Sequence, residues 1–315
     1  MAETIERRVA LGLISCGVVL SGISPDNSFA KGIVMKALDG SAQAQPRMRR
    51  AYVDGPYGQI HYLDAERGRP LVLLHQAIMT ANQFDYVFEP LIKLGFRPIA
   101  IDLPGFGLSD PTPFVPKVSD YAPVVPAVLD ALGISRAAIV GHHTGALVVN
   151  EVAINYPERV SANVMCGPLF ISEEQRAALI ADICGREKAF TALPHAAHMN
   201  KVAEARERYA GTSVSAARIS DYVVQAMMAM QRGAYWYGHN AGLHYRQEDA
   251  LMKISQPTLL LTNTGDLLYE SAKIAKNMRP DFIFKELQGG GIDIVDQQPE
   301  EWSSSIADFL SNHPQ

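Results

Sequence analysis

Cysteine is scarce in this chain of 315 residues, which has three cysteines, at positions 16, 166 and 184. Their spacing matches no set of metal-binding cysteines, so no metal centre is expected from them. A disulfide between Cys166 and Cys184 cannot be inferred from sequence, and both are expected to be buried thiols. His195 and His198 stand three residues apart, but no third ligand at a suitable spacing accompanies them. We therefore expect neither a metal nor a cofactor.

A strong charge of either sign is also missing. The 33 acidic and 28 basic residues give a formal net charge of -5, and the isoelectric point is near 6.0. This balance gives no electrostatic reason to expect nucleic acid or an anionic membrane as a partner. The chain is 48% hydrophobic, which is typical of a globular domain with an ample core. A small molecule is the expected partner, and the sequence does not indicate an oligomeric state.

The N-terminal region lacks an apolar run long enough to be a convincing membrane span. Arg7 and Arg8 precede a short apolar segment, residues 9–23, and Ser28 and Ala30 are small residues at the positions that a signal peptidase recognises. We expect a signal peptide at residues 1–30 and a linker at 31–49. The protein is then expected to be exported, either to the periplasm or as a secreted protein, and its only expected contact with a membrane is a possible N-terminal anchor. An upstream start codon with a disordered tail is the alternative, and it would leave the protein in the cytoplasm.

From residue 50 to 312, short apolar runs alternate with longer helical patterns. This alternation predicts an α/β fold with a mostly parallel sheet covered by helices on both faces. The expected strands are residues 57–63, 71–75, 97–103, 137–140, 160–165, 258–261 and 282–287. Residues 171–248 show only helical patterns, and such an insertion between two halves of a sheet is typical of a lid over an active site.

A five-residue turn, Gly141-His142-His143-Thr144-Gly145, joins an expected strand to an expected helix. Small residues at both ends of such a turn are what a nucleophile elbow requires, because the central residue adopts a strained backbone conformation with no room for neighbouring β-carbons. The position between a strand and a helix is what makes this short pattern specific. His142 is expected to be structural.

Several segments in this order resemble the α/β-hydrolase family over nearly all of residues 50–312. The run Asp102-Leu103-Pro104-Gly105-Phe106-Gly107-Leu108-Ser109 resembles the family's Asp-x-Pro-Gly-x-Gly-x-Ser segment, and Thr264-Gly265-Asp266 resembles the turn that carries the catalytic acid. The resemblance implies an α/β-hydrolase fold with a helical lid. It also implies a Ser, Asp or Cys nucleophile at the elbow and a histidine in a late loop.

Two of the three implied catalytic positions hold other residues. The nucleophile position is His143, and the position of the late histidine is Ile292, within Gly289-Gly290-Gly291-Ile292-Asp293. Only the acid, Asp266, is retained. A Ser-His-Asp acyl-transfer cycle needs both the nucleophile and the base, so ordinary serine esterase chemistry is not expected. Asp293, beside the lost histidine, is expected to be an exposed loop residue.

An imidazole at the elbow could still act as a base or nucleophile, since its ordinary pKa is about 6.5. The favoured hypothesis is a His143–Asp266 dyad that acts on a small, largely apolar ester, lactone or related carbonyl compound. The alternatives are a catalytically inactive relative that binds a small ligand or serves as a scaffold, and a reaction that uses residues of the lid. The sequence identifies no substrate.

The resemblance also places an oxyanion hole beside this dyad. The backbone N–H groups of Gln76 and Thr144 are the expected donors, and His75 occupies the start of the same loop, either in the pocket or as a structural residue. Trp236 and His239 lie late in the expected lid, where aromatic residues line a substrate pocket or pack the lid core.

Overall fold

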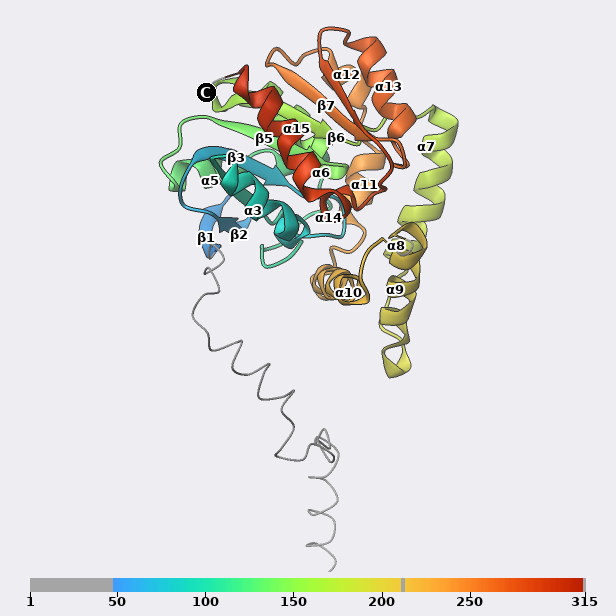
Figure 1. The fold of residues 1–315 in the computed structure, drawn as a ribbon. Helices are drawn as coiled ribbons and strands as arrows, with labels where there is room; N and C mark the ends of the chain where they lie inside the picture. The colour runs from blue at the N-terminus through green and yellow to red at the C-terminus, as the bar shows by residue number, and fades with distance from the viewer. Residues whose placement is uncertain (1–47, 211–212, 314–315) are drawn as a thin grey trace, which may run out of the picture. The chain divides into compact units, whose positions relative to one another are not determined.

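A computed structural model describes residues 48–210 and 213–313 of the chain (Figure 1). The expected signal peptide, residues 1–30, lies outside the described residues, as does nearly all of the expected linker at 31–49. Among the residues described, no helix combines the length and the apolar character needed to cross a bilayer.

Eight strands form one sheet in the order β1-β2-β4-β3-β5-β6-β7-β8. The first two pairings in this order are antiparallel and the remaining five are parallel, which confirms the predicted mostly parallel sheet. The strands are β1 (Arg49–Gly55), β2 (Gly58–Asp64), β3 (Arg69–Leu74), β4 (Phe96–Ile101), β5 (Ala137–His142), β6 (Val160–Cys166), β7 (Thr258–Asn263) and β8 (Ile283–Leu287). Strand β1 was not predicted, because its mostly exposed residues give no apolar signal.

Helices cover both faces of this sheet (Figure 1), and each face has its own apolar core. One core includes residues of α4 (Val118–Tyr121), α5 (Val124–Ala131), α6 (Thr144–Asn155) and α13 (Tyr269–Met278). The other includes residues of η1 (Ala81–Phe84), α3 (Asp85–Lys93), α14 (Ile294–Gln297) and α15 (Pro299–Ser311). The helical segment of α4 and α5 is interrupted at Pro123, since proline disturbs a continuous helical ladder.

A helical insertion separates β6 from β7, and its described residues contain no strand. It comprises α7 (Glu173–Leu179), η3 (Ile180–Cys184), α8 (Gly185–Lys188), η4 (Pro194–Ala196), α9 (Ala197–Ala210), α10 (Ala216–Gln231), α11 (Tyr237–Leu243) and α12 (Gln247–Leu251). The helical pattern predicted for residues 171–248 therefore matches the structure, with α12 ending three residues later. Cys166 and Cys184 are free and buried, as expected.

The turn between β5 and α6 is packed so closely that two of its positions have no room for a side chain. A β-carbon on Gly145 would lie 2.0 Å from the carbonyl oxygen of Leu74, and one on Gly141 would lie 2.2 Å from that of Gly145. Both obstacles are backbone atoms, which cannot rotate away. The glycines at the two ends of the motif are thus required for helix α6 to start directly above strand β3.

We expect Gly145→Ala to lower the free energy of unfolding by at least about 2 kcal/mol, because the new methyl group would overpack against the main chain of β3. Gly185→Ala is the matched control, since a β-carbon there meets no atom within 4 Å and alanine is the better helix former. Urea unfolding followed by circular dichroism measures both changes. Equal stability of Gly145→Ala and wild type would show that the turn is looser than described.

Candidate active site

His143 stands at the tip of the β5–α6 turn with φ 48° and ψ -109°, a conformation that residues other than glycine rarely adopt. Its N–H donates to the carbonyl oxygen of Cys166 at 2.7 Å, which ties the turn to the end of β6. The imidazole lies against Gly167, where a β-carbon would come within 2.4 Å of its Cδ2 atom. The absence of a side chain at Gly167 therefore makes room for the ring.

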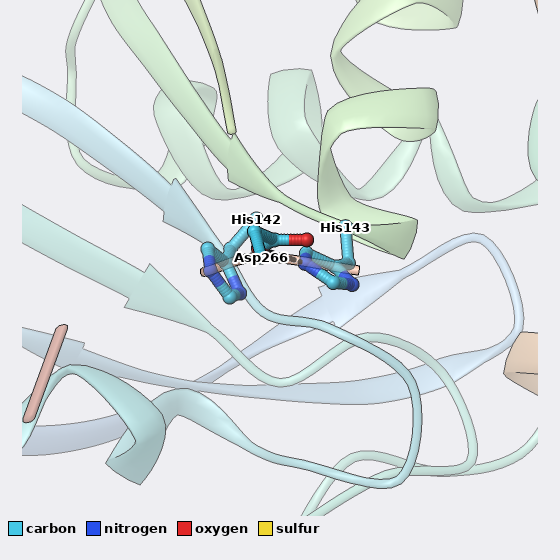
Figure 2. Close-up of side chains that lie close together, drawn as sticks. All are labelled: His142, His143 and Asp266. Atoms are coloured by element: carbon cyan, nitrogen blue, oxygen red, sulfur yellow. Dashed lines mark hydrogen bonds and ion pairs between the residues drawn. The ribbon is translucent and has the colours of Figure 1, made fainter. Parts of the chain in front are cut away.

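Asp266 lies in the turn after β7 and meets this ring directly (Figure 2). Its Oδ2 atom is 2.8 Å from Nε2 of His143, and the two side chains are 4% and 13% exposed. Burial works against ionisation of the carboxyl, but the His143 ring and the N–H of Leu268 lower the pKa of Asp266 to about 2. The carboxylate is thus ionised at neutral pH and accepts the Nε2–H of His143. That bond leaves Nδ1 as the nitrogen with a free lone pair.

His142 packs beside His143 and is fully buried. The two rings stack with their centroids 4.7 Å apart, and Nδ1 of His142 lies 2.8 Å from Nε2 of the Gln83 side chain. Burial, followed by the neighbouring His143 ring, lowers the pKa of His142 to about 3. His142 is therefore uncharged at neutral pH, and its packing agrees with the structural role expected for it.

The cluster of His142, His143 and Asp266 brings three potential metal ligands within 4.8 Å of one another. It does not present three free lone pairs, however. Nε2 of His143 holds the proton that it shares with Asp266, and Nδ1 of His142 is engaged by the Gln83 amide. A divalent cation bound through these two nitrogens would have to displace both hydrogen bonds.

The predicted oxyanion hole needs a correction. The N–H of Gln76 already donates to Oε1 of Gln83 at 2.9 Å and is not available to a substrate. Thr144 is the first residue of α6, so its N–H has no acceptor within the helix. It is therefore still available as an oxyanion donor. The N–H of Ala77 is a second candidate, since it has no acceptor in the part of the chain that the structure describes. Sequence analysis missed it because the capture of the Gln76 N–H by Gln83 has no sequence signal.

His75 is a structural residue and not part of an open pocket. Its side chain is completely buried, its Nδ1 lies 2.8 Å from the carbonyl oxygen of Gln76, and its Nε2 accepts the N–H of Leu103 at 3.0 Å. Both ring nitrogens are thus used by backbone groups. Burial lowers the pKa of His75, which keeps the ring neutral.

Trp236 and His239, predicted to line the pocket, contact another part of the insertion. His239 pairs through Nδ1 with Glu187 at 2.7 Å, and the ammonium group of Lys188 lies 5.0 Å from the centroid of the Trp236 ring. Both residues thus join the start of α11 to α8. Their role in substrate binding stays a prediction.

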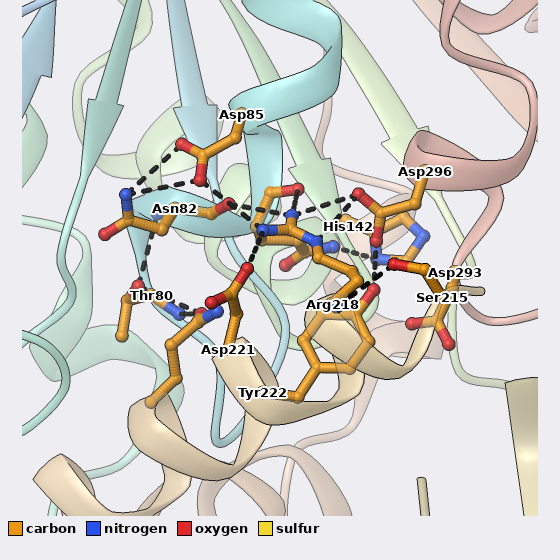
Figure 3. A network of polar contacts seen from close by, with 12 residues as sticks. Thr80, Asn82, Asp85, His142, Ser215, Arg218, Asp221, Tyr222, Asp293 and Asp296 are labelled. Carbon is orange, nitrogen blue, oxygen red and sulfur yellow. Dashed lines mark hydrogen bonds and ion pairs between the residues drawn. The ribbon is translucent and has the colours of Figure 1, made fainter. Parts of the chain in front are cut away.

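The loop that holds Ile292 is joined to the insertion by buried charges. Asp293 is 1% exposed, against the expectation of an exposed residue, and it pairs with Arg206 of α9. Asp296 accepts hydrogen bonds from Tyr222 and from Arg218 of α10, the latter at 3.0 Å (Figure 3). Asp293 and Asp296, which follow the lost histidine position, thus join α14 and the residue before it to the insertion.

A cleft of about 450 Å³ lies beside the acid turn. Neither His143 nor Asp266 lines it. Its walls come from the end of α9, the turn before Asp266 and the late loop, and they comprise Tyr209, Ala210, Ser213, Gly265, Gly290, Gly291, Gln297 and Gln298.

Comparison with known proteins agrees with this architecture. A model described as the alpha/beta hydrolase fold matches residues 69–273. A 2-hydroxy-6-oxononadienedioate/2-hydroxy-6-oxononatrienedioate hydrolase of Burkholderia vietnamiensis is 38% identical over 119 residues, which are 36% of this chain and 41% of that protein. Bifunctional epoxide hydrolase 2 of Mus musculus is 32% identical over 109 residues, 33% of this chain and 19% of that protein. The matched part of the chain thus spans less than half the length of each of these curated relatives.

Among solved structures, a bromoperoxidase from Bacillus anthracis superposes with a TM-score of 0.72 at 21% identity, covering 84% of this chain and all of that one. An esterase from Exiguobacterium antarcticum superposes with a TM-score of 0.70 at 18% identity, again over 84% of this chain and all of that one. At such identities the likeness establishes the fold alone.

The low pKa of His142 predicts how the free energy of unfolding changes at acidic pH. Between about pH 6.5 and 3 the unfolded chain binds a proton at this residue that the folded protein does not, so stability falls as the pH falls. This contribution has a slope of up to about 1.4 kcal/mol per pH unit. In His142→Phe it is absent, so wild type should lose more stability than the variant between about pH 7 and 5 in urea unfolding. Parallel stability curves would contradict the buried, neutral imidazole.

Proposed function

The chain belongs to the alpha/beta hydrolase fold family, and from that membership we propose that it hydrolyses a small, largely apolar ester, lactone or related carbonyl compound with a His143–Asp266 dyad. The observation that supports this proposal is the 2.8 Å bond between Nε2 of His143 and Oδ2 of Asp266 at the tip of the elbow. The relatives named above are hydrolases of small molecules, which is consistent with such an activity.

The proposed reaction uses His143 as a general base. Nδ1 removes a proton from a water molecule while the water oxygen forms a bond to the carbonyl carbon of the substrate, and the carbonyl electron pair moves onto its oxygen. The ionised Asp266 stabilises the imidazolium that results. When the tetrahedral intermediate collapses, the bond to the leaving oxygen breaks and the imidazolium returns its proton to that oxygen, which yields an acid and an alcohol.

Two backbone groups are suited to stabilise the intermediate. The N–H of Thr144 lies at the N-terminus of the 12-residue helix α6, where the helix dipole favours negative charge. The N–H of Ala77 is the second proposed donor, in place of Gln76. We also propose that the helical insertion acts as a lid that excludes water from this site.

A non-catalytic, ligand-binding role is the second candidate. It is favoured by the capture of the Gln76 N–H, which removes one of the two oxyanion donors that the family resemblance implies. It is also favoured by Ile292, which leaves Asp266 without the second imidazole of a complete triad.

The two candidates predict different rates. With a panel of activated esters, lactones and epoxides, His143→Ala and Asp266→Asn should each lower kcat by about a hundredfold to ten-thousandfold, the usual contribution of a positioned general base. His244→Ala and Asp308→Asn are matched controls at exposed positions and should leave kcat unchanged. Equal residual rates in wild type and in both dyad variants would exclude the dyad, and binding of panel compounds without turnover would favour the second candidate.

A further inference from the structure

Gln83 is a buried residue that the proposed reaction does not use, yet its side chain joins the two segments on which the site is built. The side chain is 1% exposed and lies in η1, before α3. Its Oε1 accepts the N–H of Gln76 at 2.9 Å, and its Nε2 lies 2.8 Å from Nδ1 of His142. One amide group thus bridges the loop after β3 and the elbow after β5.

These two contacts determine the direction of every hydrogen bond in the bridge. A backbone N–H can only donate, so the Gln83 oxygen must face Gln76 and the NH₂ group must face His142. Nδ1 of His142 therefore accepts and has no proton. Since burial keeps the ring neutral, its single proton resides on Nε2, which has no hydrogen-bond partner among the described residues.

The turn that holds Gln83 is itself fixed by helix α10 of the insertion. The guanidinium of Arg218, which is 3% exposed, donates to the carbonyl oxygens of Asn82 at 2.9 Å and Gln83 at 3.1 Å. Gln225 accepts hydrogen bonds from both the N–H and the hydroxyl of Thr80, each at 3.0 Å. Figure 3 shows Arg218 between this turn and Asp296. The main chain of Gln83 thus has little freedom to move.

We propose that Gln83 is a positioning residue that holds His142 as the Nε2–H tautomer, and that this uncharged ring supports the His143 imidazole in its bond to Asp266. The inference deepens the proposed function and rests on it for its catalytic meaning. The stacked contact between the two rings transmits the effect, since it limits rotation of the His143 ring.

The charges around His142 agree with an uncharged ring. The ionisable groups that act on it are His143 from the elbow, Asp266 from the turn after β7 and Arg206 from α9. Burial is the largest effect and disfavours a positive charge on this ring; His143 and Arg206 also lower the pKa of His142, and the opposing effect of Asp266 does not outweigh them. The proton removed from water is therefore taken up by His143 alone and is not shared with the adjacent ring.

The tautomer can be measured without a substrate. In protein labelled with ¹⁵N-histidine, long-range ¹H–¹⁵N correlation distinguishes Nδ1–H, Nε2–H and doubly protonated rings, and the signals missing in His142→Phe assign His142. We expect the Nε2–H form at neutral pH. In Gln83→Glu the carboxylate can only accept, so the proton should move to Nδ1 or the ring should become charged. Asn82→Asp is the control, because it adds the same charge one residue away and should leave the tautomer unchanged.

A neutral variant, Gln83→Met, tests the catalytic part. It removes both hydrogen bonds of the amide. It should therefore lower kcat about tenfold to a hundredfold, with KM little changed, which is the effect of removing a residue that hydrogen-bonds to a ligand side chain in metal sites. An Nδ1–H or charged His142 in wild type, or an unaltered tautomer in Gln83→Glu, would overturn the inference. An unaltered kcat in Gln83→Met would do the same. The Nε2–H tautomer in a protein that turns over no panel compound would instead reject only the proposed function.

Discussion

The hydrogen bond between His143 and Asp266 depends on a single backbone constraint, the sharp turn from β5 into α6. This turn is possible because Gly141 and Gly145 let the main chains of neighbouring elements approach one another, and it forces the side chain of residue 143 out at the end of the sheet. In the family pattern that residue is the nucleophile, and the acid is reached through a histidine from another loop. Here the imidazole is itself at the tip, and it contacts the acid without an intermediate.

The segment after β8, where the family has its catalytic histidine, makes different contacts in this protein. With Ile292 in place of histidine, this segment contributes no ring to the site, and its buried carboxylates pair with the insertion instead. Arg206 with Asp293 and Arg218 with Asp296 are largely excluded from water. Removing one partner of such a pair leaves a buried charge uncompensated, which is costly. These pairs therefore join α9 and α10 to the segment that follows β8.

The sequence predicted the fold in most of its parts, because buried parallel strands produce continuous apolar runs and the insertion has no such run. Strand β1 was missed since its residues are mostly exposed. For the site, the motif order was enough to predict that His143 and Asp266 would meet. The positions of Gln83 and Arg206 could not be predicted, since nothing in a sequence shows which buried amide or guanidinium reaches across from a distant helix.

The way His143 is attached to Asp266 has a geometric consequence for the proposed reaction. The acid holds the outer ring nitrogen, Nε2, and leaves the inner one, Nδ1, which is adjacent to the carbon that joins the ring to its side chain. In the proposed reaction, the water molecule that Nδ1 activates therefore lies near the base of the imidazole, close to the main chain of the elbow, and not beyond the far edge of the ring.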